Sequence, residues 1–225
     1  MSVGAVGAVR EFLLALVSDP FAVMNTIGLV AFALVGSSKA IREEFDLFGI
    51  TIVGLAMAFA GGVTRDLLVA RVPLALKSSS EIVLGFCGVL LAVALQLVLW
   101  SPDEHPVTLV ADAIGLATFA TTGAIVATEA NMSAFGIVAI ATVNAVGGGA
   151  FADILLDRAP FILFDDFYAS CAVFGGTMYL LAGALGAGTS IAATVCALVT
   201  VTTRLVAVTR DWGVPTVQDL GLTER

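Results

Sequence analysis

Residues 60–73 read AGGVTRDLLVARVP and residues 147–160 read GGGAFADILLDRAP, so a glycine pair, an aspartate, an arginine and a proline recur at a fixed spacing. The offset of 87 holds without a gap between residues 27–76 and residues 114–163 (114 − 27 = 87; 163 − 76 = 87). Many matching positions carry Gly, Pro or charge, which a shared apolar composition alone would not align. The chain therefore contains two copies of one unit.

The composition indicates that both copies lie in a membrane. The chain is 59% hydrophobic and 12% charged, with a mean hydropathy of +1.05, whereas a soluble domain carries about 25% charged residues. Each copy contains three apolar segments that approach or exceed the ~20 residues needed to cross a bilayer. Because three is an odd number of crossings, the second copy enters the membrane from the opposite side, which is typical of proteins that build pathways for solutes or ions.

We therefore predict an all-α integral membrane protein with seven transmembrane helices, made of two inverted three-helix repeats plus a seventh helix. Residues 1–20 form an interfacial lead-in, and residues 209–225 form a polar tail. Repeat 1 covers residues 21–100, repeat 2 covers residues 107–186, and the seventh helix lies within residues 187–208. The predicted spans are residues 21–38, 48–69, 81–100, 107–128, 133–156, 167–185 and 189–208.

The glycine runs predict kinks or unwound turns late in the second and fifth helices. Glycine weakens a helix by about 1 kcal/mol relative to alanine, and unwound backbone in a membrane is tolerated only where it is buried in protein or lines a wet cavity. Freed carbonyl groups there could replace part of a cation's hydration shell. The alternative is close helix crossing, which small residues also permit. The expected kink residues are Gly61, Gly62, Gly147, Gly148 and Gly149.

Ionisable residues within spans are costly and are candidates for function. Arg65 and Asp66 follow the first glycine run and Asp153 follows the second, while Ala152 stands where the repeat would place a second arginine. We expect the two carboxylates to favour cations and Arg65 to restrain a gate or set a barrier. A local ion pair between Arg65 and Asp66 at the end of the helix is the structural alternative.

Uncharged polar groups give a further set of pore-lining candidates. Asn144 precedes the second glycine run by three residues, and its amide is harder to satisfy within one helix than a hydroxyl is. The hydroxyl groups that could line water, or could only bond carbonyls of their own helices, belong to Ser37, Ser38, Thr121 and Thr122.

The sequence gives little support for an enzyme, a metal site or a cofactor. His105 is the single histidine and has no Cys or His at ligand spacing, and the glycine runs lack the Lys-Ser/Thr ending of a phosphate-binding loop. The net charge of −8 argues against a nucleic-acid partner. Basic residues are somewhat more numerous on the predicted C-terminal face, which favours a cytoplasmic C-terminus.

The stretch from Gly61 to Pro73 resembles the GGxxRDxLxxRxP signature of the prokaryotic trimeric intracellular cation channel family, and the stretch from Gly147 to Pro160 resembles its second copy. The resemblance implies seven transmembrane helices, a homotrimer in the lipid of a prokaryotic cell membrane, and a separate pore in each subunit. It also implies conduction of K⁺, with Na⁺ as a second candidate ion, past kinks at the glycine motifs. Ala60 and Ala152 depart from the family pattern.

Two other functions stay open at this point. Related bacterial sequences with the same double motif are described as glycine transporters, and inverted repeats are common in secondary transporters. A scaffold protein that conducts nothing would leave the glycines as packing sites only. The sequence thus favours a K⁺-permeable cation channel, with a secondary transporter of a small solute such as glycine as the alternative.

Overall fold

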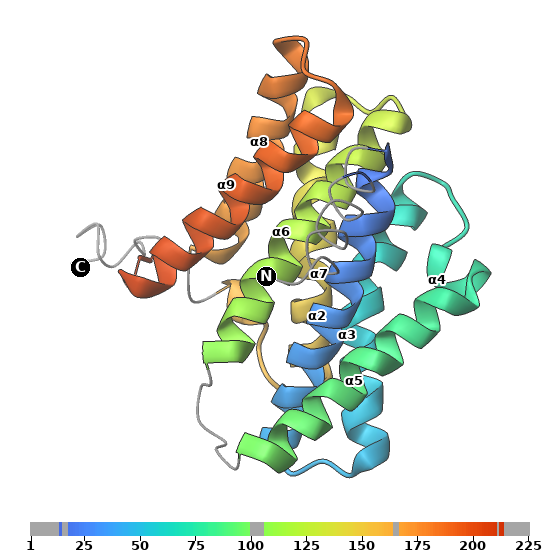
Figure 1. Ribbon diagram of the computed structural model, residues 1–225, viewed down its shortest axis with the longest axis vertical. Coiled ribbons are helices and arrows are strands. Elements are labelled where there is room, and N and C mark those ends of the chain that lie inside the picture. Colours follow the sequence, from blue (N-terminus) through green and yellow to red (C-terminus); the bar gives the residue numbers. More distant parts are fainter. Residues whose placement is uncertain (1–13, 15–17, 100–105, 164–166, 211, 214–225) are drawn as a thin grey trace, which may run out of the picture.

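A computed structural model describes residues 14, 18–99, 106–163, 167–210 and 212–213 of the chain. All regular elements in this described part are helices (Figure 1). The long helices are α2 (Pro20–Arg42), α3 (Leu47–Leu68), α5 (Ser79–Leu99), α6 (Pro106–Glu129), α7 (Ala134–Leu155), α8 (Tyr168–Ala184) and α9 (Thr189–Thr209). The connection after α3 contains the short helix α4 (Leu74–Lys77), and the connection after α7 contains a 3-10 turn, η1 (Phe161–Leu163).

The helices lie where the apolar pattern predicts spans, and their ends agree with the predicted ends to within a few residues. Six helices of the described part are long and apolar enough to cross a membrane. α8 is a shorter apolar helix of 17 residues, at the lower end of the ~17–25 residues found in spans. The chain is therefore an all-helical protein of several membrane spans. The predicted lead-in 1–20 and tail 209–225 lie almost wholly outside the described residues.

α2 and α6 form the centre of the bundle. Among the apolar spans, α2 and α6 have the largest fractions of buried residues, 61% and 78%, whereas the fraction in α5 is only 22%. α2 packs against α3, α5 and α6, and α6 packs against α7 and α9. The outer helix α5 exposes large apolar side chains such as Leu90, Leu97 and Val98, which suits contact with lipid.

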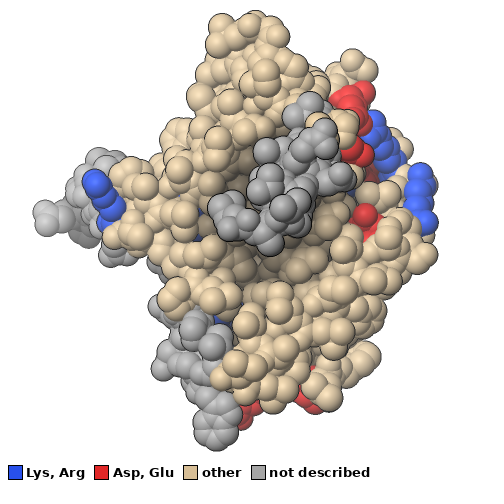
Figure 2. All heavy atoms as spheres, in the orientation of Figure 1, with Lys and Arg blue, Asp and Glu red and all other residues tan. Residues whose placement is uncertain are grey.

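Charged side chains on the surface are few and lie mostly near the margins of the face in Figure 2, with a broad uncharged surface between them. An uncharged surface of this extent would be a liability in water, but a bilayer satisfies it. The surface therefore agrees with the composition.

Contacts between helix ends show how the two halves face each other. The last turn of α2 meets the last turn of α7 through Lys39 and Asp153, and the end of α6 meets the chain after α3 through Glu129 and Arg71. In Figure 1 the sequence colours run in opposite directions along α2 and α6. Consequently α3 ends at one side of the bundle and α7 ends at the other.

Equivalent residues of the two halves start and stop the helices in the same way. Asp46 caps α3 by accepting a hydrogen bond from Gly49 N, and Ser133, 87 residues later, caps α7 by accepting one from Gly136 N. α3 and α7 are followed by left-handed residues at the same offset, Ala70 and Asp157, both with φ of 56°. The internal similarity of the sequence is thus also a similarity of local structure.

Two phenylalanines at that offset meet at the centre of the bundle. The rings of Phe32 in α2 and Phe119 in α6 pack edge to face, with centroids 5.0 Å apart. Each ring lies against a glycine of the opposite helix, Gly115 and Gly28 respectively, where a Cβ would collide with it. Because both rings are buried, they close the middle of the bundle in this structure.

Candidate functional site

The two glycine runs lie against each other where α3 crosses α7. A Cβ on Gly61 would overlap the backbone oxygen of Asn144, and a Cβ on Gly148 would overlap the backbone oxygen of Met57. These two contacts are equivalent, since 57 + 87 = 144 and 61 + 87 = 148. Gly147 also approaches Gly61, at 3.3 Å between the Cβ that it would carry and Cα. The glycines therefore permit a backbone-to-backbone crossing of α3 and α7.

Both helices continue through these glycines without a break. α3 is one α-helix from Leu47 to Leu68 and α7 is one from Ala134 to Leu155. Of the two predicted alternatives, a kink or an unwound turn, the unwound turn is wrong for this conformation, because both helices run unbroken through the close crossing. Whether the helix axes bend at these points stays a prediction.

The next glycine in each run has a different environment. A Cβ on Gly62 would have its nearest neighbour at 3.8 Å, on Arg65, and a Cβ on Gly149 would have it at 3.4 Å, on Phe161. These are ordinary van der Waals separations. Gly61 and Gly148 thus permit the crossing. Gly62 and Gly149 instead face the charged or aromatic groups at the ends of their helices.

Arg65 and Asp66 form a buried ion pair at the end of α3. Arg65 donates from Nε and Nη2 to Asp66 Oδ1, at 2.8 Å for each, and Asp66 Oδ2 accepts from Leu74 N at 2.8 Å. The residues are only 2% and 4% exposed. Phe21 lies over the guanidinium, with 5.4 Å between Arg65 Cζ and the ring centroid. The predicted local ion pair exists, and it also ties α3 to the first residue of α4.

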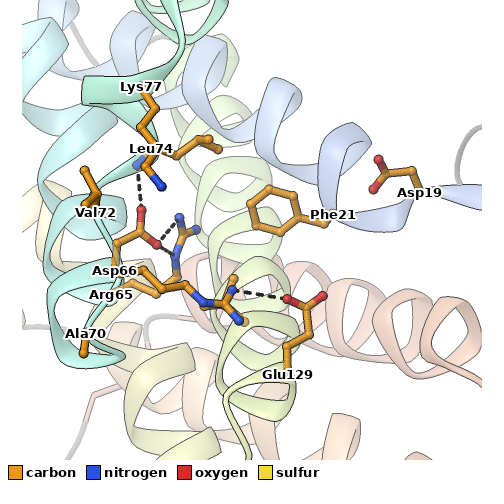
Figure 3. A pocket seen from close by; sticks show the side chains of 11 residues that line it. Asp19, Phe21, Arg65, Asp66, Ala70, Val72, Leu74, Lys77 and Glu129 are labelled. Carbon is orange, nitrogen blue, oxygen red and sulfur yellow. Dashed lines mark hydrogen bonds and ion pairs between the residues drawn. The ribbon is translucent and has the colours of Figure 1, made fainter.

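This ion pair lines a cavity of about 520 Å³ that lies next to the end of α3. Figure 3 shows Arg65 and Asp66 on one side of it, with Phe21 and Glu129 facing them. Arg71 and Lys77 contribute further positive charge to its lining. We call this cavity the α3 vestibule.

A second, much smaller cavity lies next to the vestibule and shares Arg65, Asp66 and Leu74 with it. Gly62 and Phe119 also line it. Its volume is about 10 Å³, close to the least space that holds one water molecule. The charged pair thus borders both a wide vestibule and a separate space for about one water.

The end of α7 carries the equivalent carboxylate, but a different cation pairs with it. Asp153 Oδ1 accepts from Lys39 Nζ at 2.8 Å, and Asp153 Oδ2 accepts from Phe161 N at 3.2 Å. Phe161 is the equivalent of Leu74 (74 + 87 = 161), so the two carboxylates hold their following turns alike. The cation differs, because Lys39 belongs to α2 whereas Arg65 is the sequence neighbour of Asp66.

The predicted polar residues are buried in helix contacts rather than along the two cavities. Asn144 donates from Nδ2 to Phe119 O at 2.5 Å and to Thr122 Oγ1 at 3.0 Å. Thr121 and Ser37 donate to the backbone oxygens of Ala117 and Ile50. Among the predicted site residues, Gly62, Arg65 and Asp66 line one or both of these cavities, and the other predicted residues line neither.

Ser38 and Asn144 complete the placement of the predicted polar residues. Ser38 is half-buried near the end of α2, where its backbone oxygen accepts from Arg42 Nε at 3.5 Å. Asn144 is fully buried and its Oδ1 has no hydrogen-bond partner in the described part of the chain. Its amide therefore joins α7 to α6 beside the glycine crossing.

Sequence reasoning missed three residues that the structure brings to these sites. Lys39 was assigned to a connection, although it pairs with Asp153. Asn25 in α2 donates to Glu81 Oε2 at 2.8 Å, and both residues line the small cavity. A signal for this pair existed, because their equivalents Asp112 and Tyr168 are also polar (25 + 87 = 112; 81 + 87 = 168) and also bond each other.

Comparison with known proteins gives the same division of the chain. The family model described as glycine transporter matches twice, over residues 22–97 and residues 109–184. The two matches are offset by 87 residues, like the motifs. Together they cover well over half of the chain, which shows the family directly.

Individual relatives agree with this match. The chain is 32% identical over 196 residues to the UPF0126 membrane protein YvgT of Bacillus subtilis, covering 85% of this chain and 94% of that protein. A solved structure described as the structural basis for conductance through TRIC cation channels has 34% identity and a TM-score of 0.79, covering 87% of this chain and 96% of that one. The TRIC trimeric intracellular cation channel orthologue from Rhodobacter sphaeroides shares the fold, with 23% identity, a TM-score of 0.79, and coverage of 85% and 98%. The chain therefore belongs to the family of membrane proteins described as glycine transporter, to which the TRIC channels are related.

Proposed function

We propose that this protein is a cation channel that conducts K⁺ through each subunit, between α2, α3, α6 and α7. The observation that carries the proposal is the α3 vestibule together with the charged, water-sized cavity next to it, which is lined by Gly62, the neighbour of the crossing residue Gly61. A solute pathway needs such an entrance, whereas glycines that only permit packing do not. The solved structures to which the chain is similar are described as channels, which favours a channel over a carrier.

The arrangement of the helices supports an inverted repeat around this path. The ends of α3 and α7 lie on opposite sides of the bundle, and each carries a carboxylate that holds the following turn. An inverted pair of half-pathways would place one charged entrance at each membrane face. The pathway would cross the glycine contact of α3 and α7, where the glycines allow the helices to bend or separate without losing side-chain packing.

Charge would favour cations at the α3 entrance. The small cavity is lined by the carboxylates of Asp66 and Glu81 and by one guanidinium, that of Arg65, so its charged groups sum to −1. Carboxylate rings are a common device for cation selectivity. Na⁺ would share the pathway, because nothing in this entrance selects by ion size.

The conformation described here is closed at its centre. Phe32 and Phe119 are buried between the two halves, and the space beside Arg65 and Asp66 admits about one water. Opening would therefore require the α2–α6 and α3–α7 contacts to loosen. We further propose a homotrimer in the cell membrane with a cytoplasmic C-terminus, as the similar channels and the distribution of basic residues suggest.

Single-channel recording on the purified protein in planar bilayers tests the proposal. We expect unitary currents that reverse at the K⁺ equilibrium potential under a KCl gradient, and replacement of K⁺ by Na⁺ gives the permeability ratio. Absence of currents together with uptake of labelled glycine into vesicles would replace the channel by a carrier. Absence of both would leave a scaffold.

A substitution at the crossing tests the pathway. Gly148→Leu places a side chain against the backbone of Met57 and should abolish the currents while the protein still inserts. Gly183→Leu is the matched control, because a Cβ on Gly183 of α8 would have no atom within 4 Å. Unchanged conductance in Gly148→Leu would remove the crossing from the mechanism.

A further inference from the structure

A second buried charged cluster lies away from the vestibule, between α6, α8 and α9. Tyr168 OH donates to Asp112 Oδ1 at 2.9 Å, and Arg204 Nε lies 3.6 Å from Asp112 Oδ2. Arg204 also lies over the ring of Tyr168, with 4.5 Å between Cζ and the ring centroid. Tyr168 is fully buried and Arg204 is 8% exposed. Charges this deep in a membrane protein are costly unless they are paired, so the cluster holds the three helices together.

This cluster reaches the carboxylate at the end of α7 through one aromatic ring. The ring of Phe161 packs edge to face on Tyr168, with centroids 4.6 Å apart, and Lys39 Nζ lies 4.9 Å from the centroid of Phe161. Lys39 in turn pairs with Asp153. A continuous line of contacts therefore runs from Arg204 in α9 to the ion pair that joins α2 to α7.

The described residues of the first half form no such line of contacts. In the first half, the equivalent of Asp112 is Asn25 and the equivalent of Tyr168 is Glu81. The equivalent of Phe161 is Leu74. Among the described residues α9 has no counterpart in the first half, so no described cation there corresponds to Arg204. At that end Asn25, Glu81 and Leu74 border a cavity, whereas in the second half the positions of Glu81 and Leu74 carry the aromatic residues Tyr168 and Phe161.

We propose that Arg204 is a positioning residue that holds the α7 end of the pathway closed. It fixes Asp112 and Tyr168, which fix Phe161 against Lys39 and Asp153. Movement of α9 away from α6 would break the contact between Arg204 and Asp112 and release this line of side chains. α9 would thus control only the entrance at the end of α7, so the two half-pathways would open by different movements. This inference rests on the proposed cation conduction, but one of its tests below does not.

Three variants and a control separate this role from a general effect on folding. Arg204→Gln removes the cation, and Tyr168→Phe keeps the ring contacts but removes the hydroxyl that donates to Asp112. Arg210→Gln is the control, because Arg210 is an exposed cation at the end of the same helix. Arg204→Lys keeps the charge and should restore part of the wild-type behaviour.

Open probability in planar bilayers is the first measurement. We expect Arg204→Gln to raise the ratio of open to closed time on the order of 10-fold, as a typical coupling between two sites would, and Tyr168→Phe to raise it about fivefold, as loss of one hydrogen bond would. Unitary conductance should not change, because Arg204 does not line the path. A changed unitary conductance, or an unchanged open probability in both variants, would overturn the inference.

Hydrogen exchange in nanodiscs is the second measurement and does not depend on conduction. In Arg204→Gln the peptide covering residues 157–163 should exchange faster, while the peptide covering residues 69–78 at the α3 end should not. Faster exchange everywhere would indicate general unfolding and would contradict a positioning role. If Arg204→Gln fails to insert into the membrane, the same two measurements on Tyr168→Phe test the inference. If the wild type carries no current but this local exchange pattern appears, the proposed function fails and the bracing by Arg204 stands.

Discussion

The end of α3 and the end of α7 begin from the same sequence motif and finish as different sites. At each, an aspartate accepts a backbone hydrogen bond from the residue eight positions later, Leu74 or Phe161. At the α3 end the cation is the sequence neighbour of the aspartate, and a vestibule of about 520 Å³ reaches the pair. At the α7 end the cation comes from α2, and the ring of Phe161, itself packed on Tyr168, lies against that cation. A repeat thus fixes where a charge lies, while the neighbouring residues decide whether a cavity or an aromatic side chain lies beside it.

The strongest test of this difference is to remove each cation in turn. Lys39→Met should lower the unfolding free energy by about 3 kcal/mol, the lower part of the range for breaking a buried ion pair, because Lys39 keeps 20% exposure and Asp153 would lie unpaired at a contact between helices. Arg65→Met should cost more, since Arg65 is more deeply buried than Lys39 and Asp66 would be left as an unpaired buried carboxylate. Thermal unfolding in detergent measures both.

The double variant Lys39→Met with Asp153→Asn is the control for that test. It should recover most of the lost stability, because no buried charge is left unpaired. An equal loss in Lys39→Met and Arg65→Met would remove the distinction between an ion pair across helices and one within a helix.

The next test separates the two glycines within each motif. Gly61→Ala and Gly148→Ala should each destabilise the protein by about 1–3 kcal/mol, the usual cost of overpacking, because the new methyl group meets a backbone oxygen of the crossing helix. Gly62→Ala and Gly149→Ala should be close to neutral or slightly stabilising, since their Cβ atoms find room and alanine favours helix. Denaturation midpoints of the four variants give the comparison. Equal effects at both glycines of a motif would contradict the assignment of one glycine to the crossing.

The smallest expected effect concerns the charge of the α3 entrance. Glu81→Gln keeps the shape of the side chain and its contact with Asn25, but it changes the charge of the small cavity from −1 to zero. In a wet entrance a unit charge acts with about 1 kcal/mol at 4 Å, so the cation-to-anion permeability ratio should fall a few-fold. The reversal potential under a KCl gradient measures this. Replacement of Tyr168 by Phe at the equivalent position should leave the reversal potential unchanged, and a shift there would contradict the difference between the two ends.

Much of the fold could be predicted from the sequence because membrane spans are set by local properties. Length, apolar composition and turn residues placed all seven long helices, and the 87-residue offset placed the equivalent glycine runs and carboxylates. Arg65 and Asp66 could be predicted as a pair because they are sequence neighbours at the end of a helix. The unwound turns were predicted wrongly, because the flexibility of glycine is a local property whereas its use in a close crossing depends on a second helix.

The sequence by itself determined that the chain crosses the membrane several times, that it contains one unit twice, and that each unit contains glycine, aspartate, arginine and proline at the same spacing. Only the tertiary structure decided which glycine meets the opposite backbone, that Lys39 rather than a nearby residue pairs with Asp153, and that α9 adds Arg204 beside one half alone. The physical reason is that helix formation and membrane insertion depend on short stretches of chain. Ion pairing and cavity shape depend on which side chains packing brings together from distant positions.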